Sequence, residues 1–425
     1  SKAIISASKL AKNARDGSTM GIEANVSVNI TRLQEWKQTV VGKLTGGVSQ
    51  LLKSYKVQVV QGTARFLSPR RIVVEQVAGQ VLKTINIDFD QAIVATGSSP
   101  IEIPSLKFDG RRIISSTEAL SLTAPPKKLL IVGGGVVGLE IGMAYANLFG
   151  TELTIVELLD QLLPGVDLDL VNVVTRSLLR LKAKIYLKSK VKSGLSSNEG
   201  AKVTFETPDG KELTTEVDYI LVSVGRKPNS AGLGLEVAGV EVDQKGFIKV
   251  DRQLKTTAVD IFAIGDVDGG PLLAHKASKE GIVAAEVISG LNSSFDNVAI
   301  PSAIFTDPEI AVVGMTNTEV TSKGIQTKTG KFPFIANGRA LASLETDGFT
   351  KILAEKESGR ILGVGIVGQE ASDLISEATL AIEMGATLED IALTIHPHPT
   401  LPETMMEAAE NALGRAIHIQ NRPIS

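Results

Sequence analysis

Apolar residues between positions 31 and 54 recur at steps of three and four. They are Leu33, Trp36, Val40, Leu44, Val48 and Leu51. A repeat of this kind places the side chains on one face of a helix, and such a face normally packs against a core. We therefore predict a helix over residues 31–54 with a buried apolar stripe, and we assign the stripe a packing role without chemistry.

The pattern then changes to one typical of strands. Between 57 and 99 the chain has short β-branched runs broken by Gly and Pro, namely VQVV (57–60), RIVVEQV (71–77) and AIVATGSS (92–99). Such runs predict strands and turns. Near the C-terminal end we expect a hairpin that turns at Ser358 and Gly359, and helices over 371–384 and 403–413.

A β-α-β unit follows PPKK (125–128), which we predict as a domain boundary. It consists of the strand LLIVGGG (129–135), the helix VVGLEIGMAYANLFG (136–150) and the strand ELTIVEL (152–158). Together they make a unit of about thirty residues, the size expected for two parallel strands joined by a helix.

Three glycines form G-x-G-x-x-G where the first strand meets the helix: Gly133, Gly135 and Gly138. The first allows a tight turn, the second lets the backbone approach a pyrophosphate, and the third lets the helix lie close to the strand. The helix N-terminus offers free N–H groups to the phosphates. Glu157, at the end of the second strand, can accept hydrogen bonds from ribose hydroxyls and would repel a 2′-phosphate. The pattern favours NAD over NADP; the alternative is a glycine-rich turn without a ligand.

The composition narrows the class of protein. A chain of 425 residues predicts about three domains. With 43% hydrophobic and 21% charged residues, it resembles soluble globular proteins. The net charge of -3 gives no electrostatic reason to expect nucleic acid or an anionic membrane as a partner. There is no cysteine, which excludes thiolate nucleophiles and sulfur-ligated metals within these residues. His396 and His398 lie on a Pro-rich turn without the spacing of a zinc site, so no metal is expected.

Several strings occur in the order and spacing found in the flavin-dependent disulfide reductases. They are SKAIISAS (1–8), AIVATGSSP (92–100), IVGGGVVGLE (131–140), SVGRKPN (223–229), IFAIGDVDGGPLLAHKASKEG (261–281) and HPHPTLPE (396–403). Over essentially its whole length the chain resembles the dihydrolipoamide dehydrogenases of this class I pyridine nucleotide-disulfide oxidoreductase family.

The resemblance implies an α/β fold with two Rossmann-like three-layer nucleotide-binding domains, for FAD and NAD, and an α+β dimerisation domain at the C-terminus. The FAD-binding domain would comprise 1–126 and 246–296. The NAD-binding domain would comprise 127–245, and the dimerisation domain 297–425.

The resemblance also implies which residues contact the cofactors. Asp266 would accept a hydrogen bond from a ribityl hydroxyl, and Lys2 would lie near flavin N5, paired with Glu140. Besides the glycine loop, Val191 and Gly225 would touch NAD. Further residues would contact other parts of FAD. Leu272, Leu273, Ala274 and His275 would line the isoalloxazine edge. Thr96, Gly97 and Ser98 would pass close to the body of the cofactor, and Ala64 would contact the adenine.

Some of these residues have plainer interpretations. Asp266 could cap the following turn, and His275 could be a hydrogen-bonded core histidine. Lys2 could be an exposed side chain in a frayed terminus. If Lys2 is buried instead, it needs a partner such as Glu140, because an unpaired buried lysine is costly.

By resemblance, HPHPTLPE contains the acid-base group. His398 would take the proton of a substrate thiol, and Glu403 would hold the other ring nitrogen. His396 is given no catalytic role. The implied reaction oxidises dihydrolipoamide and reduces NAD⁺ through FAD and a redox dithiol. The implied partners are a second copy of the chain, through 297–425, and lipoyl domains of 2-oxo-acid dehydrogenase or glycine-cleavage complexes. The implied location is the cytoplasm, or the mitochondrial matrix in a eukaryote.

The chain departs from the family at its start. The family carries its dithiol in C-x4-C-x-P-S-K, and this chain begins at the S-K, Ser1 and Lys2. Both cysteines and the first FAD-binding glycine loop would lie in about 40 preceding residues. We expect these residues alone to be inactive toward disulfides and to bind FAD poorly. A fragment, or a segment outside these 425 residues, explains this better than a natural paralogue without the reaction.

Two rival functions stay open. One is another flavin disulfide reductase, acting on glutathione, mercuric ion or a pyridine nucleotide. Glu157 argues against the NADP-preferring members, and the absence of a C-terminal Cys pair argues against mercury. The other rival is a non-catalytic NAD-binding dimer that serves as a scaffold.

Overall fold

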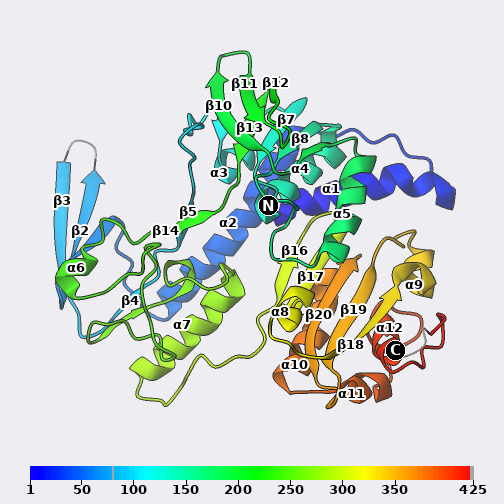
Figure 1. Cartoon of the computed structure of the whole chain (residues 1–425). Helices are drawn as coiled ribbons and strands as arrows, with labels where there is room; N and C mark the ends of the chain where they lie inside the picture. Colours follow the sequence, from blue (N-terminus) through cyan, green and yellow to red (C-terminus); the bar gives the residue numbers. More distant parts are fainter. Residues whose placement is uncertain (79–80, 422–425) are drawn as a thin grey trace. The chain divides into compact units, whose positions relative to one another are not determined.

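The computed structural model describes residues 1–78 and 81–421, and these fall into two compact units. The first unit contains 1–37, 102–224 and 298–425; the second contains 38–101 and 225–297. Figure 1 follows the chain through its helices and strands from blue to red.

A parallel five-stranded sheet lies at the centre of the middle part of the first unit. Its strand order is β6-β13-β7-β8-β9. The bounds are β6 (Ile113–Ile114), β7 (Lys128–Val132), β8 (Glu152–Val156), β9 (Lys184–Tyr186) and β13 (Tyr219–Val222). After their first residues, the inner strands β7 and β13 are apolar and buried, as expected for a sheet covered on both faces. Helix α4 (Val136–Phe149) connects β7 to β8, which confirms the predicted β-α-β unit.

Smaller elements surround this sheet. Helix α5 (Leu168–Arg180) precedes β9, and a short helix α3 (Ser116–Ala119) follows β6. A separate antiparallel sheet has the order β10-β11-β12, formed by β10 (Lys190–Ser196), β11 (Ala201–Glu206) and β12 (Glu212–Val217). At the start of the chain lie α1 (Lys2–Asp16), the 3-10 helix η1 (Gly17–Met20) and the first residues of α2 (Ile30–Ser54). Ile4 and Leu33 from these helices pack against Leu148 of α4.

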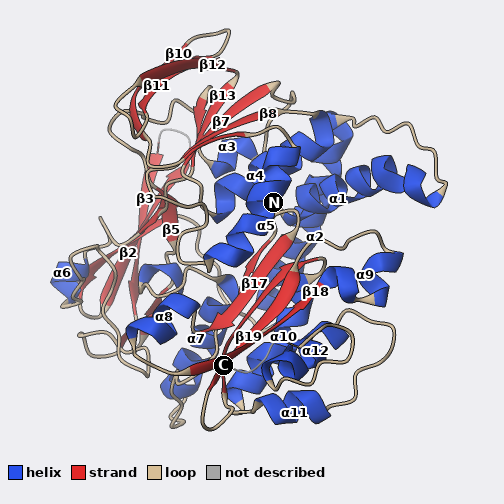
Figure 2. Cartoon of the chain, turned by 45° about the vertical axis from the view of Figure 1, so that its right-hand side comes forward, coloured by secondary structure: helices blue, strands red, loops and turns tan. Residues whose placement is uncertain are grey.

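The C-terminal part of the first unit is an antiparallel sheet with helices packed on it (Figure 2). The strand order is β16-β17-β20-β19-β18. The strands are β16 (Ser302–Ile304), β17 (Glu309–Gly314), β18 (Thr327–Pro333), β19 (Phe349–Glu355) and β20 (Ile361–Gly368). The helices are α8 (Asn317–Ser322), η3 (Phe334–Ala336), α9 (Gly338–Ala342), α10 (Ala371–Glu383), α11 (Leu388–Leu393) and α12 (Glu403–Ala412). The β19–β20 hairpin, α10 and α12 confirm the predicted elements of this region.

The second unit is built from short strands. They are β1 (Thr63–Ser68), β2 (Arg71–Ala78), β3 (Val81–Asp88), β4 (Ala92–Val94), β5 (Ser98–Pro100), β14 (Arg226–Pro228) and β15 (Ile261–Ala263). β1-β2-β3 and β14-β5 are antiparallel, whereas β15 and β4 pair in parallel. The helical segments are α6 (Leu235–Ala238), η2 (Gly265–Val267) and α7 (Ala274–Ile288). A small core around Phe66, Ile248 and Ile261 includes residues of α6 and η2.

Two predictions about local structure are corrected. The helix over 31–54 is present as α2, but most of its apolar stripe is exposed, with Leu44 at 69% and Val48 at 58%. Amphipathic spacing identifies an apolar face but does not supply a surface to cover it. Residues 57–60 are not a strand. β-branched residues favour strands only where a partner strand lies alongside, and here pairing with β2 begins at Thr63.

The predicted domain boundaries stay a prediction. Residues 102–126 lie in the first unit, where β6 pairs with β13, whereas residues 225–245 lie in the second unit, where β14 pairs with β5. Within the described residues, no helix combines the length and apolar character needed to cross a membrane.

Candidate functional site

The glycine loop between β7 and α4 has space where a phosphate would approach. At Gly133, with φ of +95°, an added Cβ would lie 2.7 Å from the Ser223 carbonyl oxygen. At Gly138 it would lie 2.3 Å from Ser223 Oγ. At Gly135 the nearest atom would be 3.9 Å away, so this side of the loop is open. Gly135 is also the N-cap of α4 and offers no side-chain cap, which leaves the first N–H groups of the helix for a ligand.

Glu157 is buried at the end of β8 and lies against the same loop. One carboxylate oxygen accepts a hydrogen bond from Gly134 N at 2.6 Å, and the other accepts from Leu159 N at 2.7 Å. Each oxygen has a second lone pair, so the pinned carboxylate can still accept from a ribose hydroxyl. The loop and Glu157 together fit a nicotinamide dinucleotide.

Lys2 and Glu140 form an ion pair, as the resemblance implied. Lys2 Nζ lies 2.9 Å from a carboxylate oxygen of Glu140 and 3.7 Å from the centre of the Phe305 ring. The buried Glu140 also accepts a hydrogen bond from Phe305 N at 2.8 Å. The carboxylate therefore joins α1, α4 and the segment between β16 and β17.

In the second unit, the structure brings Ser98 and Asp266 together across 168 positions of sequence. The Ser98 hydroxyl donates to Asp266 Oδ2, and Arg226 Nε donates to the same hydroxyl at 2.7 Å. Arg226 also lies 3.9 Å from Asp266 Oδ2. Thr96 is held separately, because its hydroxyl donates to the Asn229 carbonyl oxygen at 2.8 Å. The partly exposed Asp266 can still accept a hydrogen bond from a hydroxyl.

The buried Lys276 stabilises the loop that carries Asp266 by hydrogen bonds to two residues of that loop. Lys276 Nζ donates to Gly269 O and Asp268 Oδ1, both at 2.7 Å, and pairs with Glu280 at 2.8 Å. Burial is the main cause that raises the pKa of Asp268 to about 6.

The remaining predicted residues are distributed as follows. Leu272, Leu273, Ala274 and His275 lie at the start of α7, where His275 is exposed and is not a core residue. The α7 N-terminus has no side-chain cap, so its N–H groups suit an acceptor such as a flavin carbonyl. Ala64 lies in β1, Val191 is buried in β10, and Gly97 and Gly225 lie in the second unit with φ of +70° and +129°.

His398 and Glu403 form a hydrogen-bonded pair. His398 Nδ1 lies 2.7 Å from Glu403 Oε1, and its ring is 72% exposed. The other oxygen of Glu403 accepts from Thr400 N at 2.7 Å. Burial pushes the pKa of Glu403 upward, but the hydrogen bonds from Thr400 and His398 outweigh it, so this pKa is lowered. An ionised Glu403 holds the proton on Nδ1 and leaves the Nε2 lone pair available as a base.

His396 is bound differently. Its Nδ1 lies 2.8 Å from Thr394 O, its Nε2 lies 2.8 Å from Glu377 Oε1, and its side chain is only 5% exposed. In the described part of the chain, no group of three or more His, Cys, Asp or Glu side chains is arranged to hold a metal ion.

Comparison with known proteins explains this arrangement. Residues 1–281 match the model of the pyridine nucleotide-disulphide oxidoreductases, and residues 300–409 match the dimerisation domain of the same group. The chain belongs to this family. Its dihydrolipoyl dehydrogenase relatives include that of Bacillus subtilis, at 48% identity over 99% of this chain and 88% of the relative. That of Haloferax volcanii is 45% identical over 99% and 89%.

Solved structures of the family support the fold. The crystal structure of LpdA from Mycobacterium tuberculosis superposes with a TM-score of 0.87 at 29% identity, and covers 96% of this chain and 88% of that chain. The flavoprotein disulfide reductase RclA from Escherichia coli, at 24% identity, shares the fold with a TM-score of 0.81 over 94% and 88%. The predicted fold class, two Rossmann-like domains and a C-terminal dimerisation domain, is confirmed. The cofactors of this oxidoreductase family are FAD and NAD.

Sequence reasoning missed several polar partners. Arg226 and Asn229 lie in the SVGRKPN string, where only Gly225 was singled out, so their position in the motif was an available signal. Lys276 likewise lies inside a recognised string. Glu377 lies 19 residues before His396, on α10, and no local pattern indicates it.

Proposed function

We propose that the chain provides the nucleotide-binding, dimerisation and base-bearing parts of a dihydrolipoyl dehydrogenase. The reaction converts dihydrolipoamide and NAD⁺ to lipoamide, NADH and a proton. The observation that carries the proposal is the His398–Glu403 pair at 2.7 Å, in which one ring nitrogen is fixed by a carboxylate and the other is left for a proton. The similarity to relatives of that name over 99% of the chain supports it.

In this proposal, His398 Nε2 accepts the proton of a substrate thiol as that thiol becomes a thiolate. Glu403 keeps the ring in the required tautomer and stabilises the imidazolium that forms. The solvent-exposed ring can reach a substrate carried by another protein. His398 and Glu403 are therefore the proposed catalytic residues.

The cofactor residues keep the roles given by resemblance. Gly133, Gly135 and Gly138 receive the NAD pyrophosphate, and Glu157 binds its ribose. Asp266 and the N–H groups at the start of α7 bind FAD. By the resemblance, Lys2, whose charge is balanced by Glu140, would also contribute to holding the flavin. When bound, FAD would supply the two-electron carrier between the dithiol and NAD⁺, which is the final acceptor.

The proposal includes a homodimer formed through residues 297–425, supported by the dimerisation-domain match. It also includes lipoyl domains as the carriers of dihydrolipoamide, and a cytoplasmic location. The 425 residues contain no cysteine, so alone they should give no dihydrolipoamide turnover. NAD binding should be retained, because β7, α4 and β8 are complete.

The test joins the N-terminal segment of the Bacillus subtilis relative to Ser1 and measures dihydrolipoamide-dependent reduction of NAD⁺. Turnover is expected in this chimera, together with the visible absorption of oxidised flavin. His398→Asn should lower kcat by about 10²–10⁴-fold, the range for loss of a general base. His396→Ala should cost much less. Equal losses in the two variants would refute the assignment of the base.

His418→Asn is the matched control, since His418 also bonds a glutamate of α12, Glu407, at 2.6 Å. It should leave turnover within about twofold, because surface substitutions change little. A chimera that dimerises and binds NAD but shows neither flavin absorption nor turnover would favour the scaffold.

A further inference from the structure

Three histidines of the C-terminal part are each bonded to a glutamate, but their second ring nitrogens differ. His398 pairs with Glu403, His418 with Glu407, and His396 with Glu377. Of these three, His396 is the one hydrogen-bonded through both ring nitrogens. Its two partners are a backbone carbonyl and a carboxylate, and neither can donate a hydrogen bond. Both ring nitrogens of His396 must therefore carry protons, which makes this side chain an imidazolium.

The surroundings of His396 stabilise that charge. The hydrogen bond from His396 to Glu377 is the main cause that raises the pKa of His396, and burial opposes it. The Thr394 carbonyl and the negative charge of Glu403 act in the same direction as Glu377. Other charged groups line the groove that contains Glu377, namely Arg339, Glu370 and Asp373.

The position of His396 connects it to the proposed base. Only Pro397 separates His396 from His398, and its ring fixes one backbone dihedral between them. The far end of the segment is held as well, since Asn337 Nδ2 donates to Thr400 O at 2.9 Å. Glu377 lies on α10 and Glu403 on α12, so the segment is fastened to two helices.

We propose that His396, charged and bound through both ring nitrogens to Thr394 and Glu377, is the positioning residue that fixes the direction of the His398 ring. This inference rests on the proposed function of His398. If His396 loses a proton, one of its nitrogens presents a lone pair to an oxygen, and that contact becomes repulsive. The segment 394–400 then loses its attachment to α10, and His398 loses its fixed orientation.

The sign of the pH dependence follows from the raised pKa. The contribution of His396 is fully present below its ordinary pKa of 6.5 and is lost as pH rises through the higher folded value. Loss of the proton from His396 gives a falling limb of activity at higher pH.

The first test is NMR titration of the chain labelled with ¹⁵N-histidine, in which four histidines give few signals. His396 should titrate above pH 6.5, with both ring nitrogens protonated at neutral pH. Glu377→Gln, which keeps the shape, should lower the midpoint of His396 by about one pH unit. Glu407→Gln is the matched control and should leave His396 unchanged. A midpoint at or below 6.5, or one that Glu377→Gln does not move, would overturn the proposal.

The second test is the pH profile of kcat in the active chimera. Glu377→Gln should move the falling limb toward lower pH by about one unit and leave the activity below that limb unchanged. A purely structural role would lower activity equally at all pH values. If the chimera is inactive while His396 titrates as predicted, the proposed function fails, and the charged state of His396 with its bonds to Thr394 and Glu377 is supported. If the chimera is active and the falling limb does not move, the positioning role of His396 is refuted and the proposed function is supported.

Discussion

Two stretches of the chain have the spacing G-x-G-x-x-G, at 133–138 and at 363–368, and the structure uses them differently. The first lies between β7 and α4, with open space over Gly135. The second lies entirely inside β20, and every residue in it is buried. An added Cβ at Gly363 would lie 2.0 Å from the Met315 carbonyl oxygen. The same spacing leaves room for the proposed ligand in one place and permits close packing of the chain in the other.

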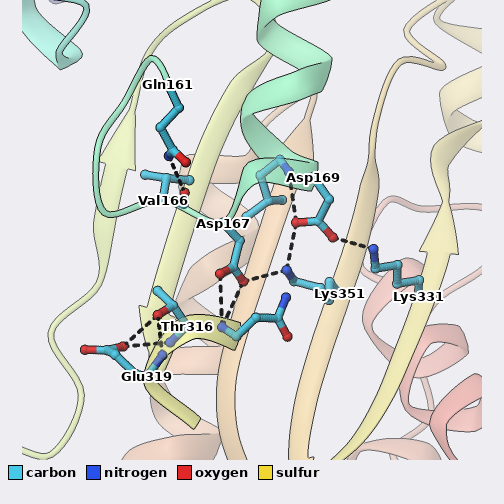
Figure 3. A network of polar contacts seen from close by, with 10 residues as sticks. Gln161, Val166, Asp167, Asp169, Thr316, Glu319, Lys331 and Lys351 are labelled. Carbon is cyan, nitrogen blue, oxygen red and sulfur yellow. Dashed lines mark hydrogen bonds and ion pairs between the residues drawn. The ribbon is translucent and has the colours of Figure 1, made fainter. Parts of the chain in front are cut away.

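The second stretch lets α5 lie on the C-terminal sheet. An added Cβ at Gly365 would be 2.7 Å from Leu170 of α5. Opposite Gly365 in the sheet is Lys351, which is 1% exposed. Its Nζ lies 2.6 Å from Asp167 Oδ2 and 2.9 Å from Asp169 Oδ1, at the start of α5 (Figure 3). Glycine thus supplies the close approach here, and a buried ion cluster fixes it.

The largest expected effect comes from breaking this cluster. Lys351→Ala should lower the free energy of unfolding by about 3–5 kcal/mol, because it leaves the carboxylates of Asp167 and Asp169, between α5 and the C-terminal sheet, without their buried cation. Urea unfolding measures the loss. NAD affinity of the folded protein should be unchanged, since the 133–138 loop is not involved.

Lys331→Ala is the control within the same cluster. Lys331 also pairs with Asp169, but its side chain is 45% exposed, so the loss should be within about 1 kcal/mol. Burial raises the pKa of Asp169, but bonds from Lys331 and Lys351 outweigh it and lower the pKa. Its contribution is therefore present above pH 3.8 and lost only as pH falls through the lower folded value. Equal losses in the two lysine variants at neutral pH would contradict the importance of burial.

A smaller effect is expected from filling the space at the second stretch. Gly363→Ala should cost about 3 kcal/mol, because its methyl group would overlap a backbone oxygen that cannot move aside cheaply. Gly42→Ala is the matched control with the opposite sign. Gly42 lies inside α2 with nothing within 4 Å of an added Cβ, so alanine should stabilise the protein by about 0.5–1 kcal/mol. Thermal unfolding of both variants checks the difference in sign.

The sequence predicted those parts of the site in which the pattern is local. The β-α-β unit has its strand, turn and helix within one short segment, and His398 and Glu403 are five positions apart. Contacts between distant segments could not be predicted from the local sequence pattern unless the family resemblance indicated them. Lys2 and Glu140 were paired in that way. Lys351 and Asp167, separated by 184 positions, were not foreseen, because a lysine in a strand pattern normally indicates solvent.

The apolar stripe of α2 also shows that a local sequence pattern does not determine packing. Its spacing identified the helix correctly, but burial depends on a second surface that periodicity does not describe. The stretch at 363–368 is a further case. Its apolar neighbours and the adjoining hairpin indicate a strand, and only the packed structure reveals which atoms occupy the space beside each glycine.

The smallest effect on stability, and the sharpest on binding, is expected at Gly135. Its φ of -80° is accessible to any residue, and an added Cβ meets no atom closer than 3.9 Å. Gly135→Val should therefore change the free energy of unfolding by less than about 1 kcal/mol. It should weaken NAD binding by at least about tenfold, because the branched side chain would fill the space through which the pyrophosphate approaches α4. Calorimetric titration with NAD measures the affinity, and the folded fraction of Gly363→Ala should bind normally. Unchanged affinity in Gly135→Val would show that the loop at 133–138, like the stretch at 363–368, serves only packing.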